Sequence, residues 1–256
     1  MTPKFSIITP TWNRADGRLQ RCIESVQCQT FVDYEHIIVD DGSKDGTNDI
    51  VTRGYIHDDW NRQQRSSIRY IRMDHAGRVQ ARNAGMMAAG GEWICHLDSD
   101  DAYDPMYLET FAYHIDRNPD ISVFVCGAVY HGMVKEDGKH IVPKWTKMRM
   151  AWVPPVDDDG GHSELFRSGR VGTGMFCFKR SCLDVIGLLP DDWINCYRVA
   201  DGLDGWLGVP EGTTGYSSKT RLVGNPWGED HALYQKLALN FRIEKIDAAL
   251  YLQYIR

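Results

Sequence analysis

Short apolar runs alternate with segments of helical period over the first hundred residues, and this alternation constrains the fold most. Four runs are too short for helices and end in polar or turn-forming residues: Phe5–Thr9, Ile37–Val39, Ile68–Ile71 and Trp93–Leu97. Strands that alternate with helices are joined by right-handed crossovers in a mainly parallel sheet. The sequence therefore predicts an α/β fold with a Rossmann-like, mainly parallel central sheet flanked by helices.

The second half of the chain is less regular and predicts a smaller, mixed region. The Asp-Gly pair at Asp137 and Gly138 is typical of a hairpin turn. The remaining expected elements are helices over 106–117 and 229–239, and strands over 122–130, 175–179, 242–246 and 249–254. No internal repeat or linker divides the chain, so we expect one domain over residues 1–256.

Charge and cysteine content exclude several classes of protein. Lys and Arg number 29 against 35 Asp and Glu, and this net charge of −6 argues against general nucleic-acid binding. Seven cysteines, an odd number without a Cys-x-x-Cys pair, favour reduced thiols in a cytoplasmic protein. No apolar run is long enough for a signal peptide or a transmembrane helix, so any membrane association is expected to be peripheral.

Acidic residues follow two of the predicted strands. Asp98, Asp100 and Asp101 end the fourth strand, and Asp40 and Asp41 end the second. Ligands of parallel sheets bind beyond these carboxyl ends. The Asp-x-Asp arrangement supplies the hard oxygen ligands that Mg²⁺ or Mn²⁺ prefers, whereas the alternative is a polar turn that leaves the sheet. Three carboxylates so close together repel one another and require a positive partner.

Other polar and aromatic residues are compatible with a nucleotide. A carboxylate at Asp40 or Asp41 is able to accept hydrogen bonds from a base or ribose, and we expect these acids also to form the N-cap and turn of the following helix. Trp12 follows the first strand, where it would cover a base or close the sheet edge. Arg78 and Arg82 lie four residues apart on one helical face. They are either ligands of a phosphate or ordinary surface residues of an amphipathic helix. Together these residues predict a site for a nucleotide diphosphate and a divalent cation.

Five segments in this order resemble glycosyltransferase family 2, a GT-A family of inverting nucleotide-sugar transferases. They are "SIITPTWNR", "IIVDDGSKDGT", "GRVQARNAG", "WICHLDSDDAYDP" and "WGEDHALYQKL". The resemblance is dense over about the first 115 residues and returns near residues 174–186 and 228–239. It implies a GT-A fold in which residues 1–117 bind the nucleotide sugar and residues 118–256 bind the acceptor.

The resemblance also implies roles for single positions. Asp98 and Asp100 match the family's Asp-x-Asp motif and would bind Mn²⁺ or Mg²⁺, and Asp230 matches the general base. The alternative for Asp230 is that an acid merely favours a helix N-terminus. The implied nucleotide-binding residues are Pro10, Thr11, Trp12, Asn13, Asp40, Asp41, Arg78, Arg82, Asn83 and Asp98.

Some features depart from the family. No Gln-x-x-Arg-Trp motif is present, which favours a single addition over processive synthesis, and no histidine follows the last strand to complete a metal shell. The aromatic segment 190–227 is expected to bind the acceptor through Trp206, Trp227 and the adjacent Glu229, or else to pack on the protein itself.

The expected function is inverting transfer of a sugar from a UDP-linked donor to a hydroxyl of a glycan, lipid-linked or other acceptor, as in polysaccharide biosynthesis. Inversion requires a carboxylate base and an electrophile that stabilises the departing diphosphate. Two alternatives remain. A metal-dependent phosphohydrolase also places Asp-x-Asp after a strand, although Asp100 lacks the Gly-Thr turn of that pattern. A nucleotide-sugar-binding protein without activity would not need the Glu229-Asp230 pair.

Overall fold

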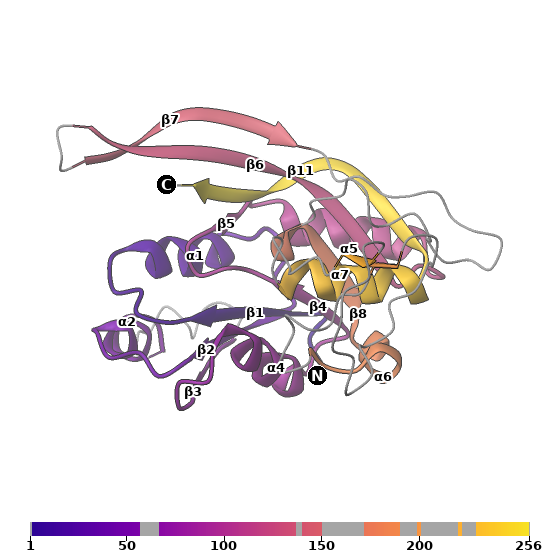
Figure 1. Cartoon of the computed structure of the whole chain (residues 1–256), viewed down its shortest axis with the longest axis horizontal. Coiled ribbons are helices and arrows are strands. Elements are labelled where there is room, and N and C mark those ends of the chain that lie inside the picture. The colour runs from indigo at the N-terminus through magenta and orange to yellow at the C-terminus, as the bar shows by residue number, and fades with distance from the viewer. Residues whose placement is uncertain are drawn as a thin grey trace.

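The computed structural model is organised around one mixed β-sheet (Figure 1). It describes residues 2–56, 67–136, 140–149, 172–189, 199–200, 220–221 and 229–255. The described strands form a nine-stranded sheet in the order β3-β2-β1-β4-β8-β6-β11-β5, with β7 beside β6, and a separate pair β9–β10. The strands are β1 (Phe5–Thr11), β2 (Tyr34–Asp40), β3 (Ser67–Arg72), β4 (Trp93–His96), β5 (Ala102–Tyr103), β6 (Val123–Glu136), β7 (His140–Arg149), β8 (Phe176–Lys179), β9 (Val199–Ala200), β10 (Thr220–Arg221) and β11 (Ile243–Ile255).

Helices cover both faces of the sheet. Figure 1 shows α1 and α4 on opposite sides of β1. The described helices are α1 (Arg18–Gln27), α2 (Thr47–Val51), α4 (Arg78–Ala88), α5 (Tyr107–Arg117), α6 (Leu183–Ile186) and α7 (Glu229–Asn240), with a π-helical turn at Thr52–Ile56 and 3₁₀ turns at Thr173–Met175 and Arg180–Cys182. Among the residues that the structure describes, no helix combines the length and apolar character needed to cross a membrane.

The four strands predicted from the first half of the chain are parallel neighbours. β1 pairs with β2 and with β4, and β2 pairs with β3, all in parallel register. Every residue of β1, β2 and β4 is buried, as expected for a sheet that carries helices on both faces. The predicted α/β class and the parallel central sheet are confirmed.

Glycine brings α4 unusually close to the sheet. A Cβ atom at Gly85 would lie 2.3 Å from Cγ2 of Ile8, so α4 is able to pack on β1 only because this position has no side chain. At the other end of the helix, Gly77 has a φ angle of +96°, which other residues rarely adopt. These two glycines direct the first turn of α4 toward the carboxyl ends of β1 and β4.

Beyond β4 the sheet becomes mixed. β8 runs antiparallel to β4 and β6, and β6 and β7 form the predicted hairpin. The two strands expected over 242–246 and 249–254 are one strand, β11, because a bulge after Lys245 lets it continue along β6. α7 packs beside β8, where the rings of Tyr234 and Phe176 lie 5.6 Å apart. This is the smaller mixed region that the sequence predicted.

Candidate active site

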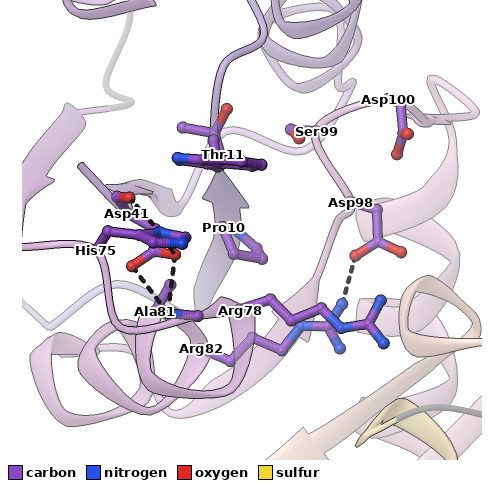
Figure 2. A pocket seen from close by; sticks show the side chains of 12 residues that line it. Pro10, Thr11, Asp41, His75, Arg78, Ala81, Arg82, Asp98, Ser99 and Asp100 are labelled. Carbon is purple, nitrogen blue, oxygen red and sulfur yellow. Dashed lines mark hydrogen bonds and ion pairs between the residues drawn. The ribbon is translucent and has the colours of Figure 1, made fainter. Parts of the chain in front are cut away.

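A pocket of about 310 Å³ opens where β1 and β4 end and α4 begins. In Figure 2, Asp41 and His75 lie on one side of Pro10, and Asp98 and Asp100 lie on the other. The volume is within the range of small-ligand sites. The lining residues are Pro10, Thr11, Trp12, Asp41, His75, Gly77, Arg78, Ala81, Arg82, Asp98, Ser99 and Asp100.

One wall of the pocket is aromatic. The indole of Trp12 is 47% exposed, and it stacks on the imidazole of His75 with centroids 4.8 Å apart and ring planes 17° apart. Nδ1 of His75 lies 2.8 Å from Oδ2 of Asp41, which fixes the orientation of the ring. Nearby, the buried hydroxyl of Thr11 has no hydrogen-bond partner among the described residues. This wall therefore presents a flat aromatic surface, with the buried hydroxyl of Thr11 nearby.

Asp41 also fixes the turn that leads into α4. Its Oδ1 accepts a hydrogen bond from the amide of Ala76 at 2.7 Å, and its Oδ2 accepts one from the amide of Gly77 at 2.9 Å. The carboxylate is buried, so these bonds compensate for its lost hydration. The acid that the sequence assigned to a base or ribose thus positions His75 and the start of α4.

The opposite wall carries charge. Arg78 and Arg82 extend from the first turns of α4 toward Asp98 (Figure 2), and Nη2 of Arg82 lies 2.5 Å from Oδ1 of Asp98. Arg82 is almost completely buried, whereas the side chain of Asp98 is 32% exposed. A planar guanidinium suits a carboxylate or a phosphate equally well. The positive partner that the acid cluster requires is therefore an arginine for Asp98.

Asp100 has arginine partners of its own. Its Oδ2 lies 3.4 Å from Nη2 of Arg14 and 3.7 Å from Nη1 of Arg18. Nη2 of Arg21 donates to its backbone carbonyl at 2.7 Å. The side chain remains 36% exposed, so it is accessible from the pocket that it lines.

The third acid of the cluster faces the core. The amide of Tyr254 donates to Oδ1 of Asp101 at 2.9 Å, and the hydroxyl of Tyr251 donates to its Oδ2 at 2.5 Å. Burial, with a contribution from the charge of Asp98, raises the pKa of Asp101 to about 8. Asp101 ties the end of β4 to β11 and does not line the pocket.

Two pocket acids are compatible with a divalent cation. No group of three or more His, Cys, Asp or Glu side chains in the described part of the chain is arranged to hold a metal ion. Asp98 and Asp100 both line the pocket, however, and Mg²⁺ is commonly held by one or two carboxylates together with substrate phosphates and water. These two carboxylates thus suit an ion that binds together with a phosphorylated ligand.

Three residues that the sequence assigned to the nucleotide do not line the pocket. Asp40 is completely buried, where it accepts hydrogen bonds from the hydroxyl of Tyr70 and the amide of Ser43. Asn13 has a φ angle of +50°, and its Oδ1 accepts a bond from a neighbouring loop amide. The side-chain amide of Asn83 makes two hydrogen bonds with the backbone of Leu189. All three stabilise the loops around the site.

The residues predicted to contact the acceptor lie at the start of α7 or before it in the chain. α7 begins at Glu229, with Asp230 second. The side chains of both residues, together with Trp206 and Trp227, lie outside the described part of the structure. Their assignments remain predictions.

Four further residues line the pocket, namely His75, Gly77, Ala81 and Ser99, and Arg14 contacts Asp100; none of these roles was predicted from the sequence. Arg14, Gly77, Ala81 and Ser99 lie inside motifs that were already recognised. His75 lies three residues before Arg78, so a turn before that helix was the available signal. The contact of Arg14 with Asp100 joins two segments 86 residues apart, which no local pattern specifies.

The sequence is similar to a known protein family and to several curated proteins. The model of a family described as "Glycosyl transferase family 2" matches residues 6–183. The chain is 31% identical over 121 residues to "Glycosyltransferase GlyA" of Streptococcus pneumoniae serotype 4, a match that covers 47% of this chain and 16% of that protein. Across GlyA and seven other curated relatives, the chain spans 16% to 45% of their length.

Solved structures share the fold. TarS 1-349 of S. aureus in complex with UDP-GlcNAc matches 99% of this chain and 59% of that one, with a TM-score of 0.57 and 20% identity. The mannosyltransferase PcManGT of Pyrobaculum calidifontis in complex with GDP-Man and Mn²⁺ matches 99% of this chain and 57% of that one, with a TM-score of 0.57 and 16% identity. At these identities the similarity establishes the GT-A type of fold.

Proposed function

The chain belongs to glycosyl transferase family 2, and from this premise we propose that its pocket binds a nucleotide-diphosphate sugar whose glycosyl group the protein transfers. The observation that carries the proposal is the joint lining of one pocket by an aromatic wall and a charged wall. Trp12 would cover the base, and the polar atoms of Thr11 and His75 would contact the nucleoside. Arg78 and Arg82 would bind the diphosphate, for which their planar guanidinium groups are suited.

A UDP-linked sugar is the proposed donor. TarS in complex with UDP-GlcNAc supports it, whereas PcManGT in complex with GDP-Man makes a guanine nucleotide the alternative to test. The two donors differ in the size of the base that must cover the exposed face of Trp12. A panel that contains both donors therefore decides between them.

Asp98 and Asp100 are the residues that would hold Mn²⁺ or Mg²⁺. Such an ion would neutralise the negative charge that develops on the departing diphosphate. Both carboxylates are partly exposed at the pocket, as a cation site requires, and the Mn²⁺ complex of PcManGT is consistent with this role. Arg82, which contacts Asp98, would orient that carboxylate.

Asp230 is the proposed general base for transfer with inversion. Its carboxylate would take the proton of the acceptor hydroxyl while the hydroxyl oxygen forms a bond to the anomeric carbon. The bond between that carbon and the phosphate oxygen breaks on the opposite face, and the diphosphate departs with its electron pair. The acceptor would be a hydroxyl of a glycan, lipid-linked or other molecule, contacted by Trp206, Trp227 and Glu229.

Nucleoside diphosphate release from UDP-GlcNAc and GDP-mannose tests the proposal, with Mn²⁺ and with chelator present. We expect release with Mn²⁺, loss with chelator, and loss in Asp100→Asn. Asp116→Asn is the matched control, because Asp116 is an exposed acid whose partner is Lys4 outside the pocket. Binding without release in the presence of an acceptor mixture would indicate the non-catalytic alternative. Phosphate release from simple phosphoesters would instead support a phosphohydrolase.

A further inference from the structure

Among the described residues, the charged group of Arg14 contacts the acidic pocket residue Asp100 only over a long distance. Nη2 lies 3.4 Å from Oδ2 of Asp100, and Nη1 lies 3.5 Å from the carbonyl of Trp12. Its Nε is buried and has no hydrogen-bond partner among the described residues. The backbone is fixed, since the amide of Arg14 donates to Oγ1 of Thr47 at 2.9 Å. The guanidinium is therefore held by longer contacts than the backbone of the same residue.

The two other arginines near Asp100 are anchored. Nε of Arg18 lies 2.9 Å from both carboxylate oxygens of Asp16, and Nη2 lies 2.6 Å from one of them. The guanidinium of Arg21 lies over the ring of Tyr254 at 3.9 Å and donates to a backbone carbonyl. Only Arg14 combines contact with the carboxylate and freedom from a second strong partner in the described region.

Charge neutrality links these contacts to ligand binding. Asp98 and Asp100 carry two negative charges, and their partners Arg82 and Arg14 carry two positive ones. A divalent cation alone would add two positive charges to this group. A nucleotide-diphosphate sugar has two negative charges on its diphosphate, so cation and donor together leave the net charge of the site unchanged. The cation is thus disfavoured alone and favoured with the donor.

We propose that Arg14 covers the carboxylate of Asp100 in the empty site and moves its guanidinium to the donor's diphosphate when a divalent cation occupies that carboxylate. This inference rests on the proposed function, because it requires a diphosphate in the pocket. It assigns Arg14 a binding role in addition to those of Arg78 and Arg82. It also makes cation binding and nucleotide binding mutually dependent, since each creates the charge that the other needs.

Arg14→Gln tests both proposed roles of Arg14, covering Asp100 and binding the diphosphate. We expect it to change the affinities for Mn²⁺ and for UDP in opposite directions. Mn²⁺ alone, titrated with electron paramagnetic resonance as the readout, should bind about threefold to tenfold more tightly, because a competing charge is removed. UDP in the presence of saturating Mn²⁺, measured by calorimetry, should bind about threefold to tenfold more weakly, because a phosphate ligand is lost. Arg14→Lys keeps the charge and should lie between the wild-type protein and Arg14→Gln for both ligands.

Arg18→Gln is the matched control. It removes the same charge beside the same carboxylate, but from a side chain anchored on Asp16. We expect Arg18→Gln to change both affinities by less than about twofold. Equal effects of Arg14→Gln and Arg18→Gln would overturn the inference, as would two affinities that stay unchanged or shift in the same direction. If the wild-type protein bound no UDP even with Mn²⁺, the proposed function itself would be contradicted and the inference with it.

Discussion

Asp100 and Asp101 are neighbours in the sequence but belong to two different regions of the molecule. Asp100 lies at the pocket, partly exposed, with guanidinium groups around its carboxylate. Asp101 lies in a buried contact between the end of β4 and residues Tyr251 to Tyr254 of β11, which we call the strap, where the hydroxyl of Tyr251 and the amide of Tyr254 donate to its oxygens. The oxygens of both side chains have partners, but of different kinds. In our proposal the guanidinium of Arg14 is exchanged for a ligand, whereas the hydrogen bonds of Asp101 stay in place.

Asp98→Asn and Asp100→Asn should have the largest effect, and mainly on the pocket. Each substitution removes one charge from the proposed cation site, so turnover of the donor should fall by about 100-fold to 1,000-fold. The melting temperature should change little for Asp100→Asn, because Asp100 and its partner Arg14 are both partly exposed. Asp98→Asn should lower it, because the buried guanidinium of Arg82 then loses its partner. Donor turnover and thermal melts measure the two effects. Loss of stability with normal turnover would show that these acids stabilise the fold, as Asp101 does, and do not bind the cation.

Tyr251→Phe should have the opposite profile. It removes one partner of a buried carboxylate, which should lower the free energy of unfolding by about 1 to 3 kcal/mol, as measured by urea denaturation. Turnover per folded molecule should remain near that of the wild-type protein.

Tyr234→Phe is the control for this change. The hydroxyl of Tyr234 is also buried, but it has no hydrogen-bond partner among the described residues. Its removal should leave stability unchanged or increase it. Equal losses in the two variants would show that the strap stabilises the protein by packing rather than by the bond to Asp101.

The sequence predicted the pocket region better than the strap. Short apolar runs and the acids that follow them are local patterns, and parallel strands bring their carboxyl ends together, so Asp41, Asp98 and Asp100 were found. The inward turn of Asp101 depends on Tyr251, which lies 150 residues further along the chain. In the sequence Asp40 and Asp41 are equivalent candidates for a ligand contact. The structure distinguishes them, because the hydroxyl of Tyr70 in β3 donates to Asp40. Single-sequence patterns do not specify such long-range partners.

The hairpin and the last strand illustrate the same limit. The Asp-Gly turn predicted the pairing of β6 with β7 because its residues are adjacent in the sequence. The continuous course of β11 was missed, since its bulge forms only against β6, more than 100 residues away.

Trp12→Ala should weaken nucleotide binding within the pocket without affecting the strap. Loss of a stacking surface for the base should raise the dissociation constant for UDP about tenfold, whereas Trp12→Phe should retain most of the affinity. Calorimetry with Mn²⁺ present measures both. Because almost half of the indole is already exposed, the melting temperature should stay the same. An unchanged affinity of Trp12→Ala for UDP would show that the uracil base does not stack on Trp12.

The smallest effect concerns a buried histidine of the core and the pH dependence of stability. Burial lowers the pKa of His36 to about 3, whereas the unfolded chain has the ordinary value of 6.5. The unfolded state therefore binds more protons between these values, so the contribution of His36 to stability is complete above pH 6.5 and is lost as the pH falls.

From pH 7 to pH 6 this loss should be about 1 kcal/mol or less, and His36→Gln should make the decline less steep. Urea denaturation at the two pH values measures the difference. An identical slope in the variant would contradict the assignment of the decline to this imidazole.

A crystal structure of the chain with UDP and Mn²⁺ tests the central claim most directly. We predict a uracil ring against Trp12, a diphosphate within contact distance of Arg78 and Arg82, and Mn²⁺ bound to a carboxylate of Asp98 or Asp100. UDP bound elsewhere, with Arg14 still on Asp100 in a pocket that holds no nucleotide, would contradict it.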